Sequence, residues 1–69
     1  MMKYVIKVAN GYIYSIQLKN GLMGKNNTVA DLCSKKQDAL RFKHKYLAQG
    51  FANILNGIVE TINIDLFVV

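Results

Sequence analysis

Cysteine, histidine and acidic side chains are scarce in this chain, and each shortage excludes a class of protein. Cys33 is the only cysteine among 69 residues, so the chain cannot form an internal disulfide. His44 is the only histidine, which leaves too few soft ligands for a zinc site and predicts that no metal or other cofactor is bound. A domain this small must therefore be stabilised by its packed core, by oligomerisation or by a partner.

Long hydrophobic runs are also missing, although 52% of the residues are apolar. The longest purely apolar run covers residues 66–69, and the N-terminus has the pattern of a strand, not of a secretion signal or a membrane span. An apolar fraction this high is typical of folded proteins. The sequence thus predicts one small domain over residues 1–69, located in the cytoplasm.

The few carboxylates are spread over different predicted elements: Asp31, Asp38, Glu60 and Asp65. An acid–base pair would need two of them in one pocket, whereas Glu60 and Asp65 face opposite sides of a strand. Cys33 and His44 have no evident third group that would orient them as nucleophile and base. The sequence predicts no catalytic site and favours a binding protein over an enzyme.

Residues 2–18 alternate between apolar and polar side chains around Asn10 and Gly11, which predicts a β-hairpin. One possible turn has two residues, Asn10 and Gly11, and pairs Ala9 with Tyr12. This register would divide the apolar side chains between the two faces of the sheet, which a sheet with one buried face disfavours.

The other possible hairpin has a three-residue loop, residues 9–11, and collects the large apolar side chains on one face. Gly11 then occupies the left-handed position that closes such a loop. Lysines and polar side chains take the opposite face, with Val5 and Ile13 as exceptions. We expect this register, in which the pairs are Val8 with Tyr12, Ile6 with Tyr14 and Tyr4 with Ile16.

A helix is predicted in the second half of the chain, and its start can be placed in two ways. Residues 29–33 could first add a short extended piece. Ser34 followed by Gln37 matches a capping box, which would begin a helix at Lys35. A helix from there to Leu55 would leave Phe42 off its apolar stripe. We favour a shorter helix from about residue 44, with a stop signal at residues 56–57 and these apolar positions: Leu47, Ala48, Phe51, Ala52, Ile54 and Leu55.

Alternation returns over residues 58–68 and predicts a long final strand with Ile58 and Ile62 on one side. The apolar end of this strand needs a cover, and pairing of its edge with a second copy would supply one. The expected fold is α+β: an antiparallel sheet made of the N-terminal hairpin and the C-terminal strand, with one helix packed on one face.

Positive charge is concentrated in the middle of the chain, which has a net charge of +5. The tyrosines of the hairpin are expected in the core, so base stacking by an exposed sheet is disfavoured. Aromatic and arginine side chains that flank the lysines are better candidates for an external contact. The candidate partner-binding residues are Lys35, Lys36, Arg41, Phe42, Lys43, His44, Lys45 and Tyr46, and their charge suits nucleic acid or an anionic protein surface.

Three segments resemble the very small early-gene proteins of bacteriophages that infect Gram-positive bacteria: residues 2–7 (MKYVIK), 39–43 (ALRFK) and 48–59 (AQGFANILNGIV). The resemblance implies a host-takeover or counter-defence protein that acts by stoichiometric binding, of which anti-CRISPR proteins are the best-represented class. Many inhibitors that mimic nucleic acid are acidic, and the lysine excess departs from that pattern.

The expected function is therefore inhibition of a host nucleic-acid machine, with a CRISPR effector as the leading target. The partner would be a host protein or a ribonucleoprotein complex, with direct contact to nucleic acid as a possibility. Two alternatives stay open from sequence: a small accessory protein that binds nucleic acid by itself, and a structural protein that dimerises through its final strand.

Overall fold

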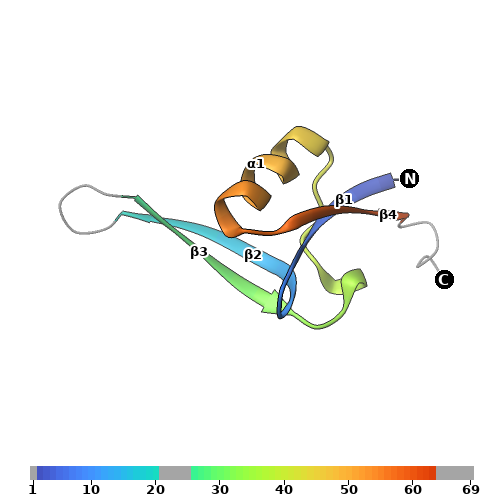
Figure 1. The fold of residues 1–69 in the computed structure, drawn as a ribbon, viewed down its shortest axis with the longest axis horizontal. Coiled ribbons are helices and arrows are strands. Elements are labelled where there is room, and N and C mark those ends of the chain that lie inside the picture. Colours follow the sequence, from blue (N-terminus) through green and yellow to red (C-terminus); the bar gives the residue numbers. More distant parts are fainter. Residues whose placement is uncertain (1, 21–25, 64–69) are drawn as a thin grey trace.

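A four-stranded antiparallel sheet and one α-helix make up the domain (Figure 1). The computed structural model describes residues 2–20 and 26–63. The strands lie in the order β3-β2-β1-β4. In chain order the elements are β1 (Met2–Val8), β2 (Gly11–Asn20), β3 (Asn26–Cys33), the 3₁₀ turn η2 (Lys36–Asp38), α1 (Lys45–Leu55) and β4 (Ile58–Asn63). The predicted α+β fold is confirmed, and the short extended piece expected over residues 29–33 is a full eight-residue strand.

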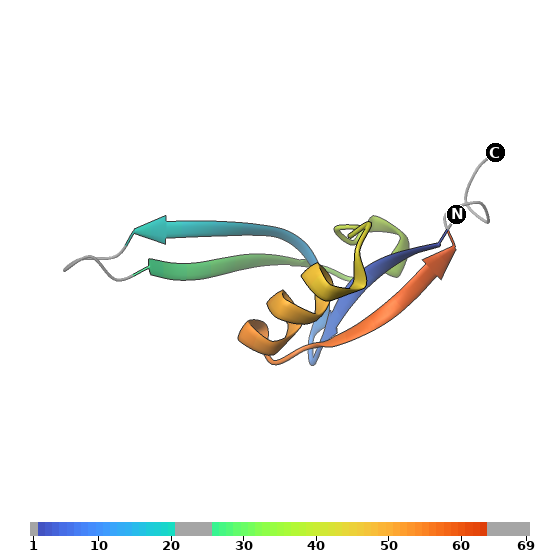
Figure 2. The same cartoon turned by 90° about the horizontal axis from the view of Figure 1, so that it is seen from above.

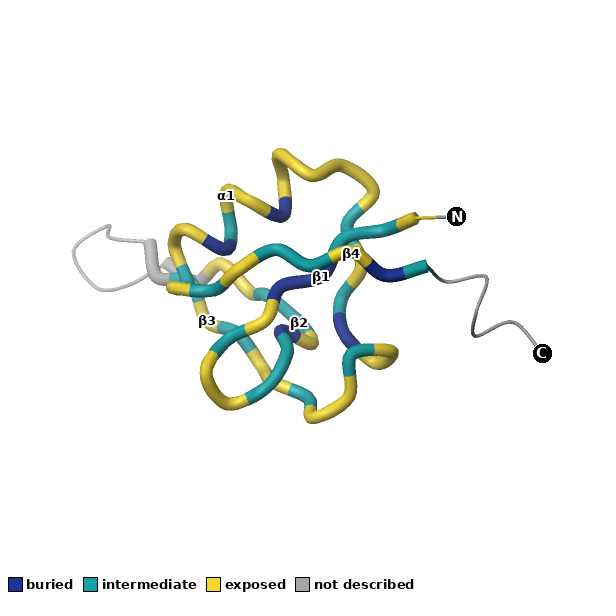
Figure 3. The backbone as a smooth tube through the Cα atoms, turned by 45° about the vertical axis from the view of Figure 1, so that its right-hand side comes forward, coloured by how far each residue is buried: buried dark blue, intermediate teal, exposed yellow. Residues whose placement is uncertain are grey.

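The central strand β1 is covered on both of its faces. Ile6 packs with Ala48 and Ala52 of α1, whereas Val5 packs on the other side with Ala39 and with Ile62 of β4. Figures 1 and 3 show β1 between α1 and the loop that carries η2. Because a strand covered on both faces buries consecutive residues, strict alternation fails here. Val5 lies on the face opposite Ile6 as expected, but that face is covered around Val5 and is not a polar surface there.

The hairpin adopts neither of the two registers considered from sequence. Val8 lies opposite Gly11 and Lys7 opposite Tyr12, so the turn consists of Ala9 and the residue after it. Gly11 belongs to β2 and has a φ of 148°, a conformation that side-chain-bearing residues rarely adopt. A Cβ at this position would also collide with the carbonyl oxygen of Cys33 in the neighbouring strand β3. The glycine is thus needed, but for strand approach and not to close a three-residue loop.

A β-bulge at Tyr14 explains why the predicted face assignment of β2 was only partly right. Ile13 pairs with Leu32 and Ser15 with Asp31, so β2 has one extra residue between them. Such a bulge shifts the alternation by one position. Ile13 and Ile16 consequently both pack on the α1 side, and Tyr14 is 55% exposed. Tyr12 points to the opposite side, against the cluster around Val5.

The helix follows the shorter of the two predictions. It begins at Lys45, with His44 as the N-cap residue, and Asn56 ends it in the left-handed conformation at φ 57°. The segment before it is held in extended form against the sheet. Phe42 donates its N–H to Tyr4 O at 2.7 Å and accepts the Tyr4 N–H at 3.0 Å, a pairing that a continuous helix from residue 35 could not make. The Ser34 capping-box signal corresponds only to the single turn η2.

The last strand is described as far as Asn63, and it forms one edge of the sheet beside β1. Ile62 is buried as expected, whereas Ile58 on the same side is exposed. The remaining part of the predicted strand, residues 64–68, lies outside the described residues. At the other edge, β2 and β3 run past the helix as a two-stranded ribbon (Figure 2).

Candidate interaction surface

The basic segment, residues 35–46, joins η2 to the first turn of α1. Most of its basic residues are solvent-exposed: Lys35, Arg41, Lys43, His44 and Lys45. Arg41 Nη2 donates to the carbonyl oxygen of Gln37 at 2.9 Å, so its side chain lies back along η2. The expected exposure of these side chains is therefore observed, while their contact with an anionic partner stays a prediction.

Lys36 differs from its neighbours because it already has a partner within the domain. Its Nζ lies 3.4 Å from Glu60 Oε1 on β4, and Tyr12 Oη donates to the same carboxylate oxygen at 3.4 Å. Both side chains of the ion pair are partly buried, at 36% and 28% exposure. Lys36 thus ties the η2 turn to the sheet, and we assign it a structural role.

The two aromatic residues of the basic segment have different environments. Phe42 is half-buried, packs against the core cluster and lies 5.9 Å from the Phe51 ring centroid. It therefore belongs to the core and not to an external contact surface. Tyr46 is 71% exposed, and its ring stacks on that of His44 at a centroid distance of 5.4 Å. Tyr46 and His44 remain candidates for contact with a partner.

The start of α1 has an unfavourable charge distribution. Among the described residues, no side chain caps the helix, and its first turn contains no acidic residue. Lys43, His44 and Lys45 lie instead at the end of the helix where the macrodipole is positive and anions are favoured. The printed sequence has no Asp or Glu anywhere between residues 39 and 59. The electrostatic strain of this arrangement would be relieved by a bound anionic group.

The residues considered for catalysis have separate partners. The Cys33 thiol donates to the carbonyl oxygen of Lys35 at 3.3 Å, while the His44 ring stacks on Tyr46. Asp31 accepts a hydrogen bond from Ser15 at 2.9 Å. In residues 2–20 and 26–63, no three His, Cys, Asp or Glu side chains are grouped so that they could hold a metal ion.

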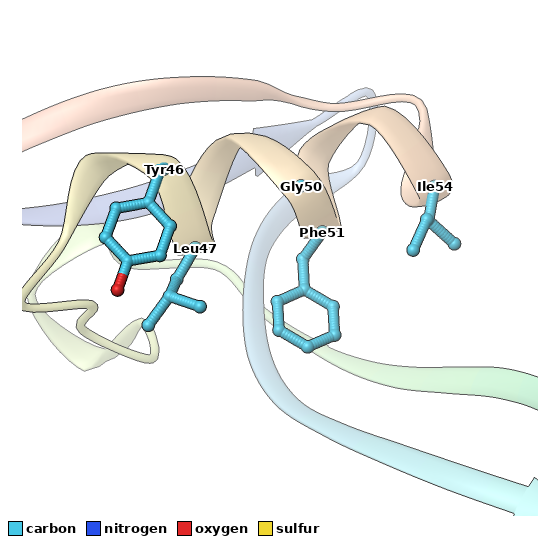
Figure 4. A pocket seen from close by; sticks show the side chains of 5 residues that line it. All are labelled: Tyr46, Leu47, Gly50, Phe51 and Ile54. Carbon is cyan, nitrogen blue, oxygen red and sulfur yellow. The ribbon is translucent and has the colours of Figure 1, made fainter.

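An exposed apolar patch on α1 is the feature that sequence reasoning missed. Leu47 and Ile54 were both expected in the core, but they are 44% and 61% exposed. Together with their neighbours they line a shallow hollow of about 230 Å³ (Figure 4). The lining residues are Tyr46, Leu47, Gly50, Phe51 and Ile54. The signal in the sequence was the small number of polar residues in the helix, which exceeds what one buried face requires.

Comparisons with protein-family models, with curated proteins and with solved structures found no match. None of the helices in the described part of the chain has the length and hydrophobicity needed to cross a bilayer. Among the described residues, the basic segment and the apolar patch on α1 are the surfaces that bear on function.

Proposed function

We propose that this chain is a non-catalytic inhibitor that binds a nucleic-acid machine stoichiometrically in the cytoplasm of a host cell. The phage early-gene proteins that it resembles suggest a CRISPR effector as the leading target. The observation that carries the proposal is the convergence of exposed cations at the uncapped start of α1. Residues 39–59 contain no Asp or Glu, so no acidic side chain within this stretch offsets the charges of Arg41, Lys43 and Lys45.

The composition of the basic segment favours an anionic surface over a specific base sequence. Lys35, Lys43 and Lys45 supply compact point charges, and Arg41 is the only side chain with the planar fork that reads guanine or phosphate bidentately. Proteins that handle nucleic acid offer anionic surfaces either through the bound strand or through acidic residues. The exposed Tyr46 adds an aromatic anchor beside the charges.

Co-purification tests the proposal directly. The tagged protein is passed through lysate of a Gram-positive host that carries a CRISPR system, with and without nuclease treatment. We expect a defined protein component of a nucleic-acid machine to remain bound after nuclease treatment. Recovery of no protein in either condition would refute the inhibitor proposal.

Charge reversal localises the contact. Glutamate at Lys35, Arg41, Lys43 and Lys45 should abolish capture and leave the fold intact, because these side chains are exposed. Lys36 is left unchanged, since glutamate there would face Glu60 and weaken the domain itself. Unchanged capture by a folded fourfold variant would show that the basic segment is not the contact surface.

Direct binding of nucleic acid is a second candidate function. It is favoured by the stacked rings of His44 and Tyr46, which lie in the same segment as Arg41, Lys43 and Lys45. Exposed aromatic rings next to Lys and Arg are the usual means of holding single strands. In this case the purified domain alone retards DNA or RNA in a gel, and the affinity falls steeply as salt rises. Absence of any shift at low salt would eliminate this candidate and leave the protein–protein contact.

A further inference from the structure

Helix α1 has apolar side chains around most of its circumference. Its only charged or amide side chains are Lys45, Gln49 and Asn53, which are spaced by four and form one narrow stripe. Gln49 Nε2 donates to Asn53 Oδ1 at 2.9 Å along this stripe. A surface helix normally divides its circumference more evenly between apolar and polar residues. More apolar surface is present on α1 than its own domain uses.

Two apolar faces can be distinguished on α1. One face packs on the sheet through Ala48 and Ala52, which are fully buried. The other face carries Tyr46, Leu47 and Ile54, all exposed. Figure 4 shows these side chains leaving the helix on the same side. An exposed apolar surface beside charged residues is typical of a protein contact site.

Gly50 lies within this second face, and packing inside the domain does not explain it. Apart from the two chain neighbours of Gly50 and the backbone of the helix itself, no atom of the described residues lies within 4 Å of the position that a Cβ on Gly50 would occupy. A glycine in the middle of a helix destabilises it relative to alanine. Without a side chain, Gly50 forms part of the lining of the shallow hollow, together with Tyr46, Leu47 and Ile54.

The charges next to the hollow indicate what kind of segment fits there. Lys45 directly precedes Tyr46, a lining residue at the end of the hollow where α1 begins, and Lys43 lies two residues before Lys45. This helix start has no acidic residue in its first turn. A carboxylate from a partner would be attracted to the lysines and to the positive end of the helix dipole. A second copy of this chain is a poor occupant, because it also carries a net charge of +5.

We propose that the hollow receives an apolar side chain from an acidic segment of a protein partner, with a carboxylate of the same segment at the start of α1. This inference rests on the proposed function, and it identifies the contacted surface as protein and not as the nucleic acid of the machine. The apolar patch provides the buried anchor of the interface, and the lysines select the partner and its orientation.

Photo-cross-linking with the full-length protein tests this assignment. A photoreactive phenylalanine analogue replaces Ile54 at the hollow, and in a matched control it replaces Gln49 on the polar stripe. After irradiation in nuclease-treated lysate, the cross-linked peptide is identified by mass spectrometry. We expect a product from position 54 and none from position 49, with the linked peptide containing both apolar and acidic residues.

The alternative occupants of the hollow give distinguishable results. A cross-link from position 54 to this same chain, either to a second copy or to its own C-terminal residues, overturns the assignment, as does a link to a basic or purely polar peptide. A product from position 49 alone also overturns it while the proposed function stands. If neither position gives a protein product and no protein co-purifies, both the assignment and the proposed function fail.

Filling the hollow is a second test. Gly50→Leu places a side chain where the partner's would lie, and Gln49→Leu adds the same bulk on the polar stripe. We expect Gly50→Leu to weaken binding of the co-purified partner about tenfold or more, since the burial of one aliphatic side chain is lost. Gln49→Leu should bind as the unmodified chain does. Equal binding by both variants would overturn the assignment.

Discussion

Replacement by alanine should change the thermal stability of the domain in opposite directions at two glycines, Gly57 and Gly50. Gly57 follows α1 at the point where the chain enters β4, and the added Cβ would lie 2.7 Å from Ile6 Cγ2 and 2.8 Å from Lys7 O. It would also lie 3.0 Å from Val8 Cγ1. Carbon atoms in proteins pack at about 3.5–4.0 Å, so β1 and the turn must move apart. Gly50, in contrast, has no described atom within 4 Å of its Cβ position beyond its chain neighbours and the backbone of its own helix.

The magnitudes follow from these contacts. An extra methyl group in a packed core typically costs about 1–3 kcal/mol, and one of the three close atoms here is a backbone oxygen that cannot rotate away. At Gly50 only the helix propensity changes, which favours alanine by about 1 kcal/mol. For a domain of this size 1 kcal/mol corresponds to about 4–8 °C in Tm. We therefore expect Gly57→Ala to lower Tm by at least about 4 °C and Gly50→Ala to raise it.

Thermal unfolding followed by circular dichroism, repeated in urea, measures both effects with the unmodified chain as reference. If Gly57→Ala is as stable as the unmodified chain, the close approach of the α1–β4 turn to β1 is incorrect. If Gly50→Ala is destabilised, the helix face around Gly50 is packed and not open, and the hollow does not exist as described.

Three further stability predictions separate structural from contact residues. Phe42→Ala should lower the unfolding free energy by about 3 kcal/mol, because the ring packs on Phe51 in the core. Tyr46→Ala should change it by less than about 0.5 kcal/mol, because this side chain is exposed. Equal effects of the two variants in urea unfolding would contradict these assignments. Asn56→Ala should cost about 1 kcal/mol, since alanine is less easily accommodated in the left-handed conformation, and an unchanged Tm would argue against that helix end. Lys36→Gln should cost less than about 1 kcal/mol, as expected for a partly exposed ion pair, and a loss above 2 kcal/mol would mean that the pair is more deeply buried than described.

The sequence predicted the element types and the helix start, and the reasons are local. The apolar spacing from Leu47 to Leu55 and the residues after it determine where α1 begins and ends, and the structure agrees to within a residue. Alternation likewise predicted β1 and β4. These signals depend on neighbours in the chain, so they can be recognised without knowledge of the tertiary fold.

The hairpin register could not be predicted because it depends on contacts that are distant in sequence. Both readings assumed one buried face and a regular strand. Val5 is instead buried by Ala39, which reaches the second face of the sheet through the η2 connection. Tyr14 interrupts β2 as a bulge that is defined only by its pairing with β3. Assigning side chains to the two faces of a sheet by their alternation along the strand fails wherever a bulge or a second covering layer is present.

The candidate surface was predicted in part. The cations were expected together from their sequence spacing, and most of them are exposed. Phe42 and Lys36 could not be separated from them by sequence, because their partners Phe51 and Glu60 lie on later elements. The apolar patch was missed since Leu47 and Ile54 were assigned to the core. Only the tertiary packing shows that α1 contacts the core through Ala48, Ala52, Phe51 and Leu55.

The central claim is that the start of α1 is the contact surface. Two double variants that each remove two positive charges test it most directly. Arg41→Gln with Lys43→Gln removes two positive charges from the basic segment, and Lys3→Gln with Lys7→Gln removes two from β1. The measurement is the amount of protein partner captured after nuclease treatment by each folded variant. We predict loss of capture for the first pair and capture near that of the unmodified chain for the second. Equal loss from both pairs would show that only overall charge matters and would contradict the claim.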